Sequence, residues 1–211
     1  MPFDKTRVGK YEEIFANFVA HHKAGNLGDP KKKVASQEIV NALHEFGDFY
    51  YIWRGLESFD GEILRRKLAK AVTGSVMLVD EQARTSESRN TLFELTFGSM
   101  LPLSGIGILF RDPDDVVARP LGTAVLVECK RIQNAANFEK RFKKAVKQLV
   151  ARLAREEDSR AKGLVAIDIS KIINPGTVLP SSLSEGNTIT GLKFAADKFC
   201  YEHIKFLGAF A

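Results

Sequence analysis

The stretch Val125-Leu-Val-Glu128-Cys-Lys130-Arg131 joins an apolar run to charged residues. Alternate side chains of an extended strand lie on the same face, so Glu128 and Lys130 should point one way and Val127 and Cys129 the other. A strand that is buried on both faces consists of nearly continuous apolar residues. A carboxylate and an ammonium group at the end of such a strand therefore need either solvent or a chemical role.

A short hairpin is predicted immediately before this strand. Asp112-Pro113-Asp114 is typical of a turn, residues 115–118 indicate a strand, and Arg119-Pro120-Leu121-Gly122 indicates a second turn. This hairpin would bring Asp115 beside Glu128. Two carboxylates a few ångströms apart repel each other by roughly 4 kcal/mol in partly screened surroundings. A divalent cation between them turns this repulsion into binding, and Mg²⁺ prefers oxygen ligands.

The elements that follow and precede the hairpin predict an α/β core. A helix over 86–103, a strand over 105–111 and the hairpin lead to the strand quoted above, and then to a helix over 135–157. A buried strand over 163–169 and a last helix over 190–206 complete the order. The 135–157 helix has the clearest pattern, with one apolar stripe and a basic outer surface. The stripe consists of Phe138, Phe142, Ala145, Leu149 and Leu153, and the basic residues are Lys140, Arg141, Lys143, Lys144, Lys147 and Arg152.

The first 85 residues read as helices rich in aromatic side chains. A helix from Ser36 toward Trp53 places five large apolar residues on one stripe, namely Ile39, Leu43, Phe46, Tyr50 and Trp53. For the 86–103 helix, the inward residues are predicted to be Phe93, Phe97, Met100 and Leu101. We therefore expect a helical N-terminal region, 1–85, and an α/β core, 86–211. The aromatic residues of the first region either cover the core or dock a second subunit.

The acidic residue that opens one strand, followed by Glu128-Cys-Lys130 on the next, resembles the PD-(D/E)XK nuclease superfamily. The resemblance implies a restriction endonuclease-like αβββαβ core with a helical N-terminal extension. It also implies a nuclease that uses Mg²⁺, or Mn²⁺ in its place, and DNA as a more favoured substrate than RNA. Asp115, Glu128 and Glu94 would then hold the metal. Lys130 would orient or deprotonate a water and offset charge on the phosphate. Gln148 matches a glutamine that some members carry on the helix after E-x-K.

Charge and composition agree with an anionic partner. The formal net charge is +5. Residues 130–162 contain eleven Lys or Arg against four Asp or Glu, a net of +7. We expect nucleic acid to lie across this region and to contact Arg131, Lys140, Lys143, Lys144, Lys147 and Gln148. The sequence has two cysteines and no apolar run of about 18 residues, so we expect a cytoplasmic protein with no membrane contact. A homodimer would allow two sites to cut two strands.

Each assignment has an alternative. Glu128 and Lys130 could form a solvent-exposed salt bridge, and Thr91-x-x-Glu94 also matches a helix capping box. Asp114 competes with Asp115 as the residue that opens the strand. Gln148 could be solvated. The whole chain could be a catalytically inactive module that binds nucleic acid or a protein partner.

Overall fold

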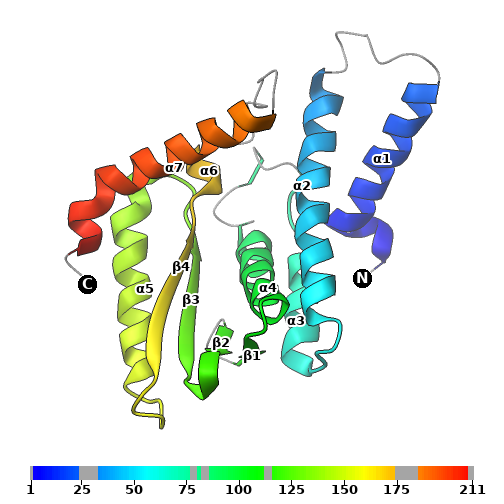
Figure 1. Ribbon diagram of the computed structural model, residues 1–211. Coiled ribbons are helices and arrows are strands. Elements are labelled where there is room, and N and C mark those ends of the chain that lie inside the picture. The colour runs from blue at the N-terminus through cyan, green and yellow to red at the C-terminus, as the bar shows by residue number, and fades with distance from the viewer. Residues whose placement is uncertain are drawn as a thin grey trace.

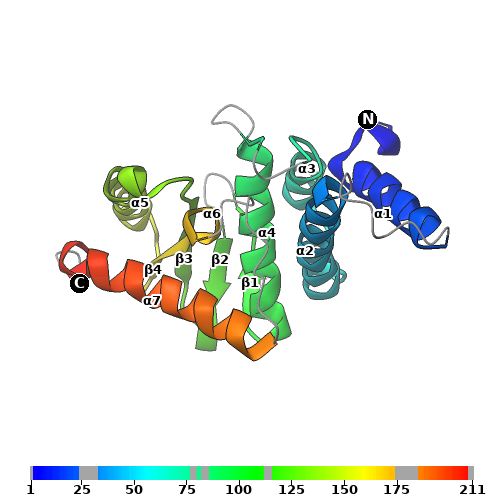
Figure 2. The ribbon, with the colours of Figure 1, turned by 90° about the horizontal axis from the view of Figure 1, so that it is seen from above.

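A four-stranded mixed sheet with helices on both faces organises the chain (Figures 1 and 2). The computed structural model describes residues 2–23, 33–76, 80–81, 86–111, 116–173 and 185–208. The chain is thus of the α/β class, and the predicted order of elements around the sheet is confirmed. That order is α4 (Glu87–Leu103), β1 (Gly107–Leu109), β2 (Val116–Arg119), β3 (Val125–Arg131), α5 (Phe138–Leu153) and β4 (Lys162–Asp168).

Helices before and after this core complete the described fold. They are α1 (Arg7–Lys23), α2 (Lys33–Leu56), α3 (Glu62–Ala71), the short α6 (Ser170–Ile173) and α7 (Glu185–Gly208). α7 lies across the end of the sheet, where Phe199 contacts Phe138 of α5 with ring centroids 5.1 Å apart (Figure 1). Among the described residues, none of the helices is long and apolar enough to cross a membrane.

The strand order is β1-β2-β3-β4, with antiparallel pairs except for β3 and β4, which are parallel. Val116 at the start of β2 pairs with Val127, and Glu128 pairs with Val165 of β4. The predicted hairpin is confirmed: a short turn, Pro120–Gly122, joins β2 to β3, and Gly122 has a φ of 81° that favours glycine. β4 is an edge strand of the sheet. It is not the buried strand that we predicted, because its first three residues are exposed.

The two faces of β3 enter different hydrophobic clusters, as its alternation predicts. Val127 and Cys129 pack with Leu92 and Leu95 of α4. Leu126 lies on the opposite face, in a cluster with Leu149 of α5. The sheet is therefore covered by α4 on one side and by α5 on the other (Figure 2).

The apolar stripe predicted for α2 is wrong. Leu43 and Tyr50 are exposed, and Trp53 is 58% exposed, whereas Ala42 and Ile52 are buried. Among the described residues of α2, the buried side chains are instead Ala42, Glu45, Ile52 and Leu56. Gly55 lies against the backbone of Ser99, so contact with α4 rather than the apolar pattern sets the buried face. Met100 of α4 is also exposed, although we predicted it to face inward.

The N-terminal helices share one hydrophobic core with the sheet. Ile52 and Leu56 of α2 and Leu64 of α3 belong to the same buried cluster as Val127 and Cys129 of β3. The boundary expected near residue 85 therefore lies within a common core.

Candidate active site

Glu128 is the most completely buried acidic side chain of the sheet, with an exposure of 0%. Its Oε1 accepts a hydrogen bond from Lys130 Nζ, which confirms that the two side chains share one face of β3. Its Oε2 accepts one from Arg152 Nη1 on α5. Arg152 was expected on the outer surface of α5, but its side chain is only 14% exposed and turns toward the sheet. Glu128 lies within the strand, which continues to Arg131.

We considered a solvent-exposed salt bridge between Glu128 and Lys130. The salt bridge is present, but the carboxylate of Glu128 is buried. Removing a carboxylate from water costs several kcal/mol, and ion pairs with good geometry repay that cost. Glu128 has two cationic partners from two elements, β3 and α5. The arrangement is an anionic centre inside the protein, compensated by protein cations.

Gln148 lies one helical turn before Arg152 on α5, so both side chains lie on the same side of the helix. Its Oε1 is buried and has no hydrogen-bond partner among the described residues. A solvated Gln148 is therefore not what the structure shows. Buried acceptors without a donor are uncommon and call for an explanation.

The other predicted metal ligands are placed differently. Asp115 and Asp114 lie outside the described residues; the described part of β2 begins at Val116, level with the Glu128 end of β3. Glu94 forms an ion pair of 2.6 Å with Lys67 of α3. α3 and α5 lie on opposite sides of the sheet, so the partners of Glu94 and Glu128 come from opposite sides (Figure 2).

The capping box proposed for Thr91 and Glu94 is wrong. α4 begins at Glu87, so Thr91 lies inside the helix. Its hydroxyl donates to the carbonyl oxygen of Glu87 at 3.0 Å. Glu94 is consequently not required for capping.

The basic residues predicted to contact nucleic acid separate into two groups. Arg131 turns away from solvent and is held by Glu81 and by Asp168, the latter at 2.9 Å. Arg131 therefore pairs with acidic side chains of the protein itself. The exposed group lies on α5 and consists of Lys140, Lys143, Lys144 and Lys147.

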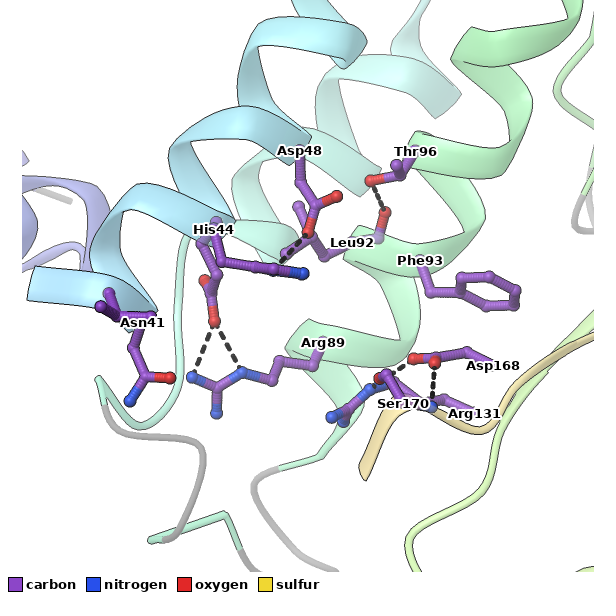
Figure 3. Close-up of a pocket in the computed structure, with 12 residues that line it drawn as sticks. Asn41, His44, Asp48, Arg89, Leu92, Phe93, Thr96, Arg131, Asp168 and Ser170 are labelled. Carbon is purple, nitrogen blue, oxygen red and sulfur yellow. Dashed lines mark hydrogen bonds and ion pairs between the residues drawn. The ribbon is translucent and has the colours of Figure 1, made fainter. Parts of the chain in front are cut away.

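A cavity of about 290 Å³ lies between α2, α4 and the ends of β3 and β4 (Figure 3). The sequence did not indicate it, because its lining comes from segments that are far apart in the chain. In its lining, Glu45 is held by Arg7 at 2.7 Å and by Arg89 at 2.8 Å. Half of the residues that line the cavity are ionisable, namely His44, Glu45, Asp48, Arg89, Arg131 and Asp168.

Asp48 lines this cavity and has a raised pKa. Burial raises its pKa from 3.8 to about 6, and the His44 ring 3.9 Å away opposes that rise only in part. Glu45 and Asp168 raise it further through charge repulsion. The side chain of His44 is itself exposed.

Donor chemistry decides whether a divalent metal suits the Glu128 region. The carboxylate of Glu128 and the unsatisfied amide oxygen of Gln148 are the hard oxygen ligands that Mg²⁺ prefers. Within the described ranges, no three His, Cys, Asp or Glu side chains gather into a metal-binding group. The residues present fit such an ion in kind, with Glu128 as the charged member.

Comparison of the chain with protein-family models, curated proteins and solved structures finds no match.

Proposed function

We propose that this protein is a metal-dependent nuclease with a restriction endonuclease-like core that hydrolyses phosphodiester bonds, with DNA favoured over RNA. The observation that carries the proposal is the position of Glu128 and Lys130 on one face of β3, at the end of the strand that lies level with the start of β2. The element order from α4 to β4 agrees with the core that the resemblance implies. Glu128 and Asp115 are the proposed metal ligands. Glu94, which was also expected to hold the metal, is paired with Lys67 on the other side of the sheet and is not included.

Each of the protein's own groups has a part in this proposal. Mg²⁺ or Mn²⁺, when bound, would supply a Lewis acid and lower the pKa of a coordinated water. Lys130 carries a positive charge beside Glu128, where it orients a water and offsets negative charge that develops on a phosphate. Gln148 offers an acceptor oxygen on the facing helix.

The exposed lysines of α5 supply the contact surface for nucleic acid. Lys140, Lys143, Lys144 and Lys147 belong to the segment with a net charge of +7. Contacts to phosphate position a nucleic acid without reading its sequence. This surface therefore suits binding along the backbone.

Cleavage assays test the proposal. The purified protein is incubated with plasmid, linear duplex and single-stranded DNA and with RNA, in Mg²⁺, Mn²⁺ or EDTA. Lys130→Gln should abolish metal-dependent cleavage, whereas Lys162→Gln, an exposed residue of β4, should not. Asp115→Asn and Asp114→Asn separate the two candidate acids, because only the metal ligand should be needed. Equal cleavage by wild type and Lys130→Gln would contradict the assignment.

The second candidate is a catalytically inactive module that binds nucleic acid. It is favoured by the full compensation of Glu128 by Lys130 and Arg152, which leaves the carboxylate stable without metal. This alternative predicts binding by the α5 lysines with no cleavage in any metal.

A homodimer is also proposed, since Tyr50 and Trp53 of α2 expose aromatic surface. Light scattering during size-exclusion chromatography measures the mass directly, and the monomer mass would contradict the dimer.

A further inference from the structure

The charge balance around Glu128 is complete before any metal arrives. One buried carboxylate accepts from an ammonium and from a guanidinium, each on a different oxygen. A divalent ion at the same carboxylate would meet two positive charges already in place. Repulsion between like charges in a buried site is strong, so one of these cations must move for the ion to bind tightly.

Both cations keep some exposure, 23% for the side chain of Lys130 and 14% for that of Arg152. Lys130 has a part in the proposed reaction, where it orients a water beside Glu128. Arg152 has no such part, and it lies in the last turn of α5, which ends at Leu153. Its long stem lets the guanidinium reach solvent while the helix stays in position.

We propose that Arg152 is a placeholder for the metal: it holds Oε2 of Glu128 in the metal-free protein and is displaced when a divalent cation binds. The inference rests on the proposed function and adds a residue that controls metal affinity. Arg152 keeps a buried carboxylate compensated during folding, before the metal is present. The same ion pair lowers the affinity of the site for metal, because binding must first break it.

Removing Arg152 should therefore change two properties in opposite directions. The metal-free protein should become less stable, because the buried carboxylate of Glu128 loses the cation that binds its Oε2. The site should bind metal more tightly, by about tenfold, because the competing ion pair is gone. A ligand that binds the folded state raises the Tm, and tighter binding raises it more. The increase in Tm on adding metal should therefore be larger for the variant than for wild type.

The experiment titrates Mn²⁺ alone into wild type, Arg152→Gln and Arg152→Lys by calorimetry, and measures the Tm of each with and without Mn²⁺. Arg152→Gln should bind more tightly and show a lower metal-free Tm. Arg152→Lys retains the positive charge, so its affinity should stay near that of wild type. Should the glutamine variant fail to fold, Arg152→Met is titrated in its place, since it also removes the charge, and it should bind Mn²⁺ more tightly than wild type. Arg155→Gln, an exposed arginine three residues later, is the matched control, and Glu128→Gln shows which heat belongs to this site.

The outcomes separate this inference from the function. Equal Mn²⁺ affinity of wild type and Arg152→Gln, together with metal-dependent cleavage by wild type, overturns the placeholder and leaves the nuclease intact. Much tighter binding by Arg152→Lys than by wild type also overturns it, since charge is then not what competes. If no variant binds Mn²⁺ and wild type cleaves nothing, both the inference and the proposed function fail.

Discussion

The buried carboxylate of Glu128 and the half-buried carboxylate of Asp48 differ in the cations that compensate their charge. Glu128 accepts from Lys130 and Arg152. Asp48 lines the cavity between α2 and α4, and the ion-pair partner that the structure shows for it is His44 at 3.9 Å. Burial without a close cation penalises the ionised form, which is why the pKa of Asp48 rises to about 6.

Asp48→Asn should therefore stabilise the protein at neutral pH. The pKa of Asp48 is about 6 in the folded protein, against 3.8 as the ordinary value. The ionised carboxylate thus destabilises the fold above pH 6 by up to about 3 kcal/mol. That cost disappears as the pH falls from about 6 to about 4, because the folded state then binds the proton first. The variant should exceed wild type in free energy of unfolding at pH 7.5 and match it near pH 4.

Urea unfolding at these two pH values measures the effect. The groups that act on Asp48 are His44, Glu45, Asp168 and Arg7, and none is altered by the substitution. Glu12→Gln, an exposed acid on α1, serves as the control and should change stability little at either pH. A gain that is equal at both pH values would show that ionisation of Asp48 is not its cause.

At the scale of elements, the contact between α2 and α4 depends on Gly55. A Cβ at this position would collide with the carbonyl oxygen of Ser99, which is backbone and has little freedom to move. Gly55→Ala should thus push the two helices apart and destabilise the protein by roughly 1–3 kcal/mol. The free energy of unfolding in urea reports the change.

Gly47 of the same helix is the matched control for Gly55. A Cβ at Gly47 would meet no atom within 4 Å, so the same substitution tests helix propensity alone. Gly47→Ala should stabilise the protein by about 0.5–1 kcal/mol. A lower free energy of unfolding for Gly55→Ala and a higher one for Gly47→Ala would establish that α2 and α4 pack closely at Gly55. A higher free energy of unfolding for both variants would refute it.

The exposed lysines of α5 give a second prediction at this scale. Replacing Lys140, Lys143, Lys144 and Lys147 by Gln should weaken binding to every DNA sequence alike, because these residues contact phosphate. The slope of log affinity against log salt should fall by about 0.9 for each lost contact with duplex. Fluorescence anisotropy over a salt series measures both quantities. Two exposed lysines at the start of the chain, Lys5 and Lys10, provide the control substitutions; an unchanged slope in the α5 variant would place the interface elsewhere.

The elements that could be predicted are those whose structure depends on residues close together in the sequence. The turn residues around Gly122 and the alternation of β3 fix the hairpin, and the apolar stripe of α5 fixes its buried face. The pairing of Glu128 with Lys130 followed from strand geometry alone. Arg152 could not be foreseen as their partner, because its position depends on how α5 packs on the sheet. The buried face of α2 likewise depends on the approach of α4 at Gly55, which the helical pattern does not encode.

For the whole molecule, the N-terminal helices and the sheet form one core. Ile52, Leu56 and Leu64 cover the face of the sheet that contains Val127 and Cys129. Residues 1–85 are thus expected to be required for folding, although the residues proposed for catalysis lie beyond them. Ion pairs link the same two regions, since Glu45 of α2 contacts Arg89 of α4 at 2.8 Å.

A chain that consists of residues 86–211 alone should therefore fail to fold cooperatively. Without α2 and α3, apolar residues of α4 and β3 would be exposed, and each large side chain that loses its cover costs about 1.5–3 kcal/mol. Several such side chains lose their cover at once, so their combined cost is comparable with the margin of about 5–15 kcal/mol by which domains are usually stable. Circular dichroism melts and amide NMR spectra of the fragment are the measurements. Co-expression of residues 1–85 with residues 86–211 is the control and should restore a cooperative melt. A sharp melt and dispersed amide signals from residues 86–211 alone would instead establish the sheet as an independent unit, with the helices as an attachment.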